Sequence, residues 1–263
     1  MFKARQYAYV VTQVSARKGE LLPRSLFLSL SEAHALDEFT SRLRDTRYGA
    51  LLAEISAPIT AEKLEKIFMD SYAMDIHDVL RHSPNKSRKF LEIFSKRLLY
   101  DNLKVVFKSK ISNISPEEAL PSLFNLEKLY PRTWHLLMRA LEAESIEKAL
   151  SVLSAVKELE ETGAYAIELY KKYNIAALID AAVDKKFYLM LWDAFDKLDK
   201  LDKSKALKFL GFETDVFNMM TIFRGRIWEI DVQVLRELLL PRLYEVKEKE
   251  LDALLMEAKT EKL

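Results

Sequence analysis

Hydrophobic residues recur along the chain every three or four residues, which is the spacing of one face of an α-helix. In the first such stretch, residues 3–18, Tyr7, Val10 and Val14 share one face, and the pattern predicts a helix that ends near Gly19. No segment shows the sustained alternation of apolar and polar residues that is typical of a β-strand. The pattern therefore predicts an all-α protein.

The same spacing predicts further helices along the rest of the chain. They are expected over residues 23–43, 46–52, 60–80, 87–110, 131–143, 145–160, 163–182, 184–200, 204–226 and 245–263. Thr60 is the expected N-cap of the helix over 60–80, and Gly163 and Gly211 are interpreted as interruptions of the helical pattern. The strongest helix start is Ser115-Pro116-Glu117-Glu118, because a Ser cap, a Pro and a Glu that closes a capping box follow in order.

One short stretch occurs twice, as Asp101–Lys110 and as Phe217–Arg226. In each copy an asparagine is followed by three apolar positions, by a phenylalanine five residues on, and by two basic residues that flank a small one. The copies are about 110 to 120 residues apart, which is longer than the units of ordinary solenoids and indicates a repeated domain.

A second marker recurs at a similar interval. Leu22-Pro23-Arg24, Tyr130-Pro131-Arg132 and Leu240-Pro241-Arg242 each open a new run with apolar periodicity. The sequence thus predicts tandem helical-bundle repeats: a first repeat over residues 1–120, a second over 121–239, and the opening helix of a third, incomplete repeat over 240–263.

The composition argues against some classes of function. Lys plus Arg number 41 and Asp plus Glu 40, so the formal net charge is +1 and gives no general attraction to nucleic acid or to anionic membranes. The start of the chain is not typical of a signal peptide, and no run approaches the ~20 apolar residues of a membrane span. We expect a soluble protein that binds no nucleic acid and does not span a membrane.

Motifs for chemistry are missing. The sequence holds no phosphate-binding glycine loop and no cysteine. Of its four histidines, His77 and His82 are five residues apart, which does not place them on one helix face as a metal site requires. We predict no catalysis, no cofactor and no metal site.

Two interpretations of the repeated stretch remain open. The structural one is that Asn102 and Asn218 form hydrogen bonds inside the bundle and that basic residues sit at helix ends for electrostatic reasons. The other is that the repeated polar strip marks a surface shared by the repeats, which the repetition of the asparagine favours. Trp228, where the helix pattern breaks, is the best candidate for an exposed anchor. The candidate partner-binding residues are Arg17, Arg97, Asp101, Asn102, Lys104, Lys108, Asp215, Asn218, Arg224, Arg226 and Trp228.

Several motifs, taken in order, resemble a known family. They are Ala16-Arg17 before Leu21-Leu22, the run Leu43–Gly49 (L-R-D-T-R-Y-G), the run Tyr100–Lys110 (Y-D-N-L-K-x-x-x-K-x-K), and Glu213–Arg226 (E-x-D-x-x-N, then R-x-R). With them the chain resembles the C subunit of archaeal A-type and bacterial V-type rotary ATPases, the counterpart of the d subunit of the eukaryotic V-ATPase.

The resemblance implies a funnel of three similar helical domains about a pseudo-threefold axis, on the cytoplasmic face of the membrane proteolipid ring. It also implies a non-catalytic coupling subunit whose partners are the central stalk and that ring. Two features depart from the family pattern: Asp215 lies three residues before Asn218 whereas Asp101 directly precedes Asn102, and the third repeat stops about twenty residues after Pro241.

Two rival readings are a helical-repeat adaptor unrelated to rotary ATPases and an all-α enzyme with its site between repeats. The adaptor would co-purify with other proteins than stalk and ring subunits. Against the enzyme, we expect no deep pocket that gathers histidine with carboxylates.

Overall fold

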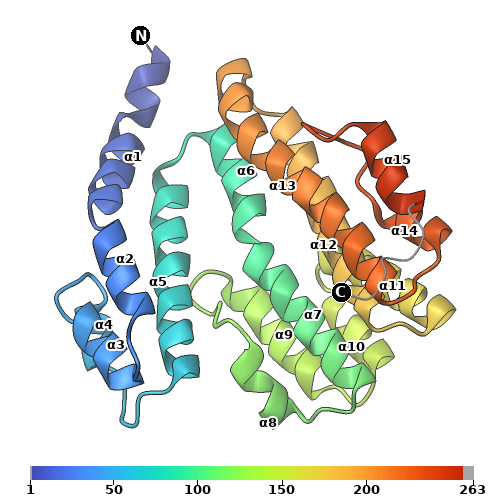
Figure 1. The fold of residues 1–263 in the computed structure, drawn as a ribbon, viewed down its shortest axis with the longest axis horizontal. Coiled ribbons are helices and arrows are strands. Elements are labelled where there is room, and N and C mark those ends of the chain that lie inside the picture. Colours follow the sequence, from blue (N-terminus) through green and yellow to red (C-terminus); the bar gives the residue numbers. More distant parts are fainter. Residues whose placement is uncertain (1, 257–263) are drawn as a thin grey trace. The chain divides into compact units, whose positions relative to one another are not determined.

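The structure is a computed structural model that describes residues 2–256, with side chains from Tyr7 onward. Every regular element in this range is a helix, which confirms the predicted all-α class (Figure 1). In chain order the elements are α1 (Phe2–Gly19), α2 (Arg24–Ser31), α3 (Leu36–Leu43), α4 (Gly49–Ala53), α5 (Ala61–His82), α6 (Asn85–Ser95), α7 (Arg97–Ile111), α8 (Pro116–Ala119), the 3₁₀ helix η1 (Leu120–Ser122), α9 (Pro131–Glu142), α10 (Ile146–Leu153), α11 (Lys157–Tyr173), α12 (Ala177–Asp196), α13 (Lys200–Ile227), α14 (Val232–Leu238) and α15 (Glu248–Met256).

The described residues form two compact units. The first holds residues up to 99 together with 117–135, and the second holds residues 100–116 together with those from 136 onward. This division follows contacts in space, whereas the repeats over 1–120, 121–239 and 240–263 were drawn from the sequence and stay a prediction. Of the last repeat, residues 257–263 lie outside the described part of the chain.

The core of the first unit is built from leucines of α2, α3, α4 and α5. Leu30, Leu43, Leu52 and Leu64 are buried together, and partly buried apolar residues such as Phe68 pack around them. Burying each leucine side chain contributes about 1.5 to 3 kcal/mol. The predicted cap of α5 is confirmed at Thr60, whose Oγ1 accepts a hydrogen bond from the Lys63 N–H at 3.3 Å.

The core of the second unit lies where α7, α11 and α12 meet. Phe107 of α7 is fully buried, and the rings of Tyr100 and Phe187 lie 5.6 Å apart between α7 and α12. Tyr188 in turn contacts Phe217 of α13 at 5.2 Å. Aromatic pairs at these separations stabilise the core beyond the contribution from burying their apolar area.

The prediction of one continuous helix over 87–110 is wrong, because the helix is interrupted at Lys96, between α6 and α7. The Ser95 hydroxyl donates to the carbonyl oxygen of Glu92 at 2.9 Å, and the Lys96 N–H bonds to Ile93 rather than to the residue four back. This tightening of the last turn ends α6. The run over 23–43 likewise divides into α2 and α3.

The helix ends predicted over 145–200 are also wrong. Asn174 adopts a left-handed backbone conformation, with φ of 55°, and terminates α11 where a continuous helix was expected. Gly163 lies inside α11. Only glycine fits there, because a Cβ would meet Phe107 Cζ at 2.7 Å and Leu150 Cδ1 at 2.8 Å. The strong start signal at Pro116 does begin a helix, but α8 is only four residues long.

Candidate partner-binding site

Two buried polar residues of α13 hold one segment of the chain in place: Asn218, in the second copy of the repeated stretch, and Asp215, three residues before it. The Asn218 side chain donates from Nδ2 to the Leu240 carbonyl oxygen at 3.2 Å and accepts from the Leu240 N–H at 2.8 Å. Asp215 accepts three backbone N–H groups, from Tyr244, Glu245 and Val246, at 2.7–3.0 Å. Segment 240–246 is therefore fixed against α13 without being helical itself.

This arrangement corrects one prediction. The third marker, Leu240-Pro241-Arg242, was expected to open a helix, but α15 begins only at Glu248. Side chains of α13 satisfy the backbone of the marker segment, so it does not need helical hydrogen bonds of its own.

The asparagines of both motifs lie in the interior. Asn102 and Asn218 are fully buried and Asp215 is 3% exposed. The structural interpretation of the two asparagines is thus favoured, since a side chain without accessible surface cannot contact a partner, and the same reasoning applies to Asp215.

Lys104 and Lys108, in the first copy of the repeated stretch, form ion pairs with two carboxylates of α12. Lys104 Nζ lies 2.8 Å from Asp101 and 2.5 Å from Asp184, while Lys108 Nζ lies 3.0 Å from Asp180. Burial alone would lower the pKa of Lys104, but the carboxylates of Asp184 and Asp101 together raise that pKa above 10.5.

Sequence reasoning missed Asp180 and Asp184. A signal existed, because the two aspartates are four residues apart and match the spacing of Lys104 and Lys108. Only the fold brings α7 and α12 together, and the sequence does not specify which acidic pair would meet the lysines.

The two arginines at the end of the second copy of the repeated stretch differ in their surroundings. Arg226 turns inward and donates to the Leu254 carbonyl oxygen at 2.5 Å, whereas Arg224 is exposed. Trp228 follows α13 directly and is 48% exposed, as expected of an anchor. A cavity of about 60 Å³ is lined by Arg224 and Trp228 together with Asp180 and Asp184. The structure therefore brings residues of both motifs to α12.

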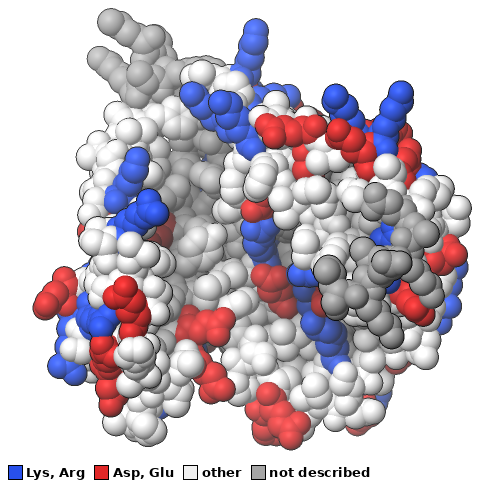
Figure 2. Space-filling view, in the orientation of Figure 1, with Lys and Arg blue, Asp and Glu red and all other residues white. Residues whose placement is uncertain are grey.

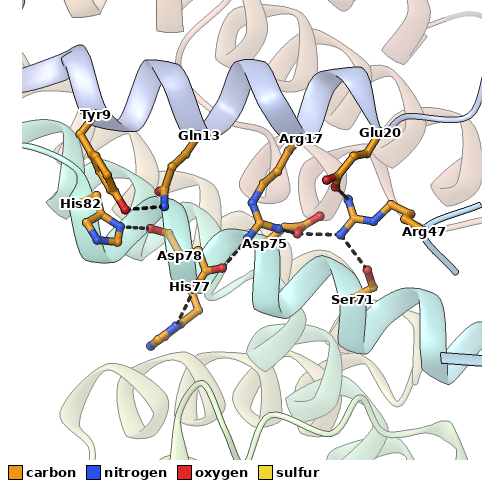
Figure 3. A network of polar contacts seen from close by, with 10 residues as sticks. All are labelled: Tyr9, Gln13, Arg17, Glu20, Arg47, Ser71, Asp75, His77, Asp78 and His82. Carbon is orange, nitrogen blue, oxygen red and sulfur yellow. Dashed lines mark hydrogen bonds and ion pairs between the residues drawn. The ribbon is translucent and has the colours of Figure 1, made fainter. Parts of the chain in front are cut away.

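Arg17 and Arg97 belong to the first unit. Arg17 forms ion pairs with Asp75 and Asp78 of α5, and Arg47 also contacts Asp75, at 2.9 Å (Figure 3). These contacts hold α1 on α5, so Arg17 has a clear structural role. Arg97 is half-buried at the first position of α7.

One cavity brings a histidine together with carboxylates, which was not expected from the sequence. A cavity of about 320 Å³ in the first unit is lined by His77 together with Asp70, Asp78 and Glu127. His77 Nδ1 lies 3.7 Å from Asp78 Oδ1, and burial raises the pKa of Asp70. The groups do not assemble further: in the described part of the chain, no three metal-ligating side chains come together.

Within residues 2–256, no helix combines the length and the apolar character needed to cross a lipid bilayer. In the view of Figure 2, Lys and Arg side chains lie beside Asp and Glu side chains and do not form a field of one sign.

Comparison with known proteins gives one consistent result. The sequence model of the family described as "ATP synthase (C/AC39) subunit" matches residues 10–263. The C subunit of the A-type ATP synthase of Methanocaldococcus jannaschii is 24% identical over 225 residues, which cover 84% of this chain and 54% of the relative. The corresponding protein of Thermococcus kodakarensis, which has the same name, is 24% identical over 92% of this chain and 63% of its own length. That of Methanosarcina acetivorans is 27% identical over 83% and 58%. The matched part thus spans less than two thirds of these relatives.

Proposed function

The chain belongs to the ATP synthase (C/AC39) subunit family, and from this premise we propose that it is a non-catalytic coupling subunit of an A- or V-type rotary ATPase. In this role it links the central stalk to the membrane proteolipid ring and transmits rotation during proton or sodium transport. It is cytoplasmic and peripheral, attached to the membrane through the complex. The match over residues 10–263, with the names of the relatives, is the observation that carries the proposal.

The internal contacts of the second unit suit a part that transmits force. Helix α13 has 28 residues, so it is roughly 42 Å long at 1.5 Å per residue. Asn218 and Asp215 fasten it to segment 240–246, and Lys104 fastens α7 to α12. Elements joined by buried polar contacts resist sliding, because such contacts are satisfied in only one register.

The exposed candidates supply the contact surface in this proposal. Trp228 offers an aromatic anchor, and Lys108 and Arg224 offer charge at its side. Polar contacts of both signs suit an interface that assembles specifically and can separate. The buried residues Asn102, Asp215 and Asn218 contribute by fixing the helices that carry this surface.

Affinity purification of the tagged full chain from native membranes tests the proposal. Stalk and ring subunits are expected to co-purify, and Arg224→Glu combined with Trp228→Ala is expected to lower their recovery. The matched control is Lys249→Glu with Met256→Ala, two exposed positions of α15. Recovery of an unrelated set of proteins would instead favour a helical-repeat adaptor.

A further inference from the structure

Helix α13 buries mostly small and polar residues, together with Leu210 and Ile222, and exposes six large apolar residues from Phe209 onward. Its buried face consists of Leu210, Gly211, Thr214, Asp215, Asn218, Thr221, Ile222 and Gly225. Its exposed face carries Phe209, Phe212, Met219, Met220, Phe223 and Ile227, with exposures of 36–61%. This reverses the usual order of an amphipathic helix on a soluble protein, where the apolar stripe faces the core.

The outward apolar residues form one continuous seam, which the partly buried Val216 completes. Phe209, Phe212, Val216, Met219 and Phe223 follow one another at alternating steps of three and four residues. With Met220 and Ile227 they occupy an arc about 100° wide at 3.6 residues per turn. We call these seven residues the outer stripe. The surface over the middle of α13 is largely without charged side chains (Figure 2).

The spacing of the outer stripe indicates what covers it. Alternating steps of three and four place side chains as knobs for the holes of a second helix, as in a coiled coil. A contiguous exposed apolar surface of this kind marks an interaction site.

The charges beside the outer stripe are basic. Lys205 continues its line towards the start of the helix, and Lys208 and Arg224 flank it on opposite sides, all three exposed. The two carboxylates of this stretch turn elsewhere: Glu213 accepts from the Tyr188 hydroxyl of α12 at 3.0 Å, and Asp215 is buried.

We propose that the outer stripe of α13 is the docking site for an amphipathic helix of a partner chain whose apolar seam is flanked by acidic residues. A second copy of this chain fits poorly, because its stripe would bring Lys205, Lys208 and Arg224 against like charges. An anionic membrane is disfavoured by the balance of 41 basic and 40 acidic residues over the chain and by the narrow, helix-shaped seam. The inference is independent of the rotary-ATPase assignment, since it concerns the chemistry of the partner.

Photo-cross-linking in cells tests the docking site. Benzoylphenylalanine replaces Phe212 or Phe223 in the full chain, and the matched control position is Phe27 of α2, which is 63% exposed. An aromatic replacement at an exposed position keeps the fold, which an unchanged melting curve verifies. Mass spectrometry is expected to find one segment of one partner at both stripe positions and not at Phe27. That segment has apolar residues every three to four positions and Asp or Glu beside them.

Charge reversal sharpens the test. Lys205→Glu with Lys208→Glu is expected to lower the cross-linking yield by about tenfold, because opposite charges become like charges. An undiminished yield overturns the proposal, as do cross-links to lipid, cross-links to a second copy of this chain, or none at either stripe position. A helical acidic partner from outside a rotary ATPase would uphold the docking site and overturn the proposed function. If stalk and ring subunits co-purify but no such helical partner is cross-linked, the docking site is overturned and the proposed function is upheld.

Discussion

Asn218 and Leu240 are joined by two hydrogen bonds: the side-chain amide of Asn218 donates to the backbone carbonyl of Leu240 and accepts from the Leu240 N–H. Asn218 is fully buried and Leu240 is 2% exposed, so water cannot replace either bond. The Asn218 side chain therefore fixes Leu240, at the start of the segment whose later residues bond to Asp215, and it takes the place of the backbone partners that a helix or sheet would supply.

Replacement of that side chain should be costly. Asn218→Leu leaves the N–H and the carbonyl of Leu240 buried and unpaired, and we expect a loss of about 2 to 4 kcal/mol in the free energy of unfolding. Urea denaturation measures the loss. The control, Asn85→Leu, changes an exposed asparagine and should stay within about 0.5 kcal/mol. Equal stability of the two variants would mean that the Leu240 contact is not formed.

The link between α7 and α12 can be measured by a double-mutant cycle. Lys104→Met leaves Asp101 and Asp184 facing each other without a cation, and we expect a loss of about 1 to 3 kcal/mol, less than for a fully buried pair because Asp184 is partly exposed. Together with Asp184→Asn, the cycle should give a coupling of about 1 kcal/mol or more. Additive effects of the two changes would contradict the pairing.

The same lysine predicts a pH dependence. Its pKa is raised in the folded chain above the ordinary 10.5, so its stabilising contribution is fully present below pH 10.5 and is lost as the pH rises through the raised folded value. The difference in unfolding free energy between the wild type and Lys104→Met should be constant from about neutral pH to pH 10.5 and should shrink above it. A difference that already shrinks near neutral pH would show that burial outweighs the two carboxylates.

Gly211 should not tolerate a methyl group, although alanine favours helices. A Cβ at Gly211 would lie 2.4 Å from Tyr244 Cγ and 2.7 Å from Tyr244 Cβ, on a segment that Asp215 holds in place. Gly211→Ala should therefore destabilise the protein by about 1 to 3 kcal/mol. Gly19→Ala is the matched control, because nothing lies within 4 Å of the added atom. A melting curve of Gly211→Ala that matches the control would contradict this packing.

The helical class was predictable because the helices show buried faces in the sequence pattern, as Leu64 and Leu80 do in α5. The ends of the helices were not. The sequence around Gly163 is typical of a helix break, yet the residue lies inside α11, and it is a glycine because Phe107 and Leu150 leave no room for a side chain. That requirement comes from residues far away in the sequence.

The candidate site was predictable in part. The repeated stretch drew attention to Asn218 and Arg224, and the break in the helix pattern drew attention to Trp228, but a local pattern cannot tell a buried side chain such as Asn218 from an exposed one such as Trp228. The acidic partners Asp180 and Asp184 became visible only once α12 lay beside α7. The outer stripe was hidden for a related reason: apolar residues on both sides of α13 conceal which side faces the core.

Coupling itself is the central claim, and ion transport in membrane vesicles measures it most directly. Vesicles that lack this chain should hydrolyse ATP without accumulating ions, and addition of the purified full chain should restore ion uptake. Ion uptake that proceeds equally well without the chain would contradict the proposed coupling function.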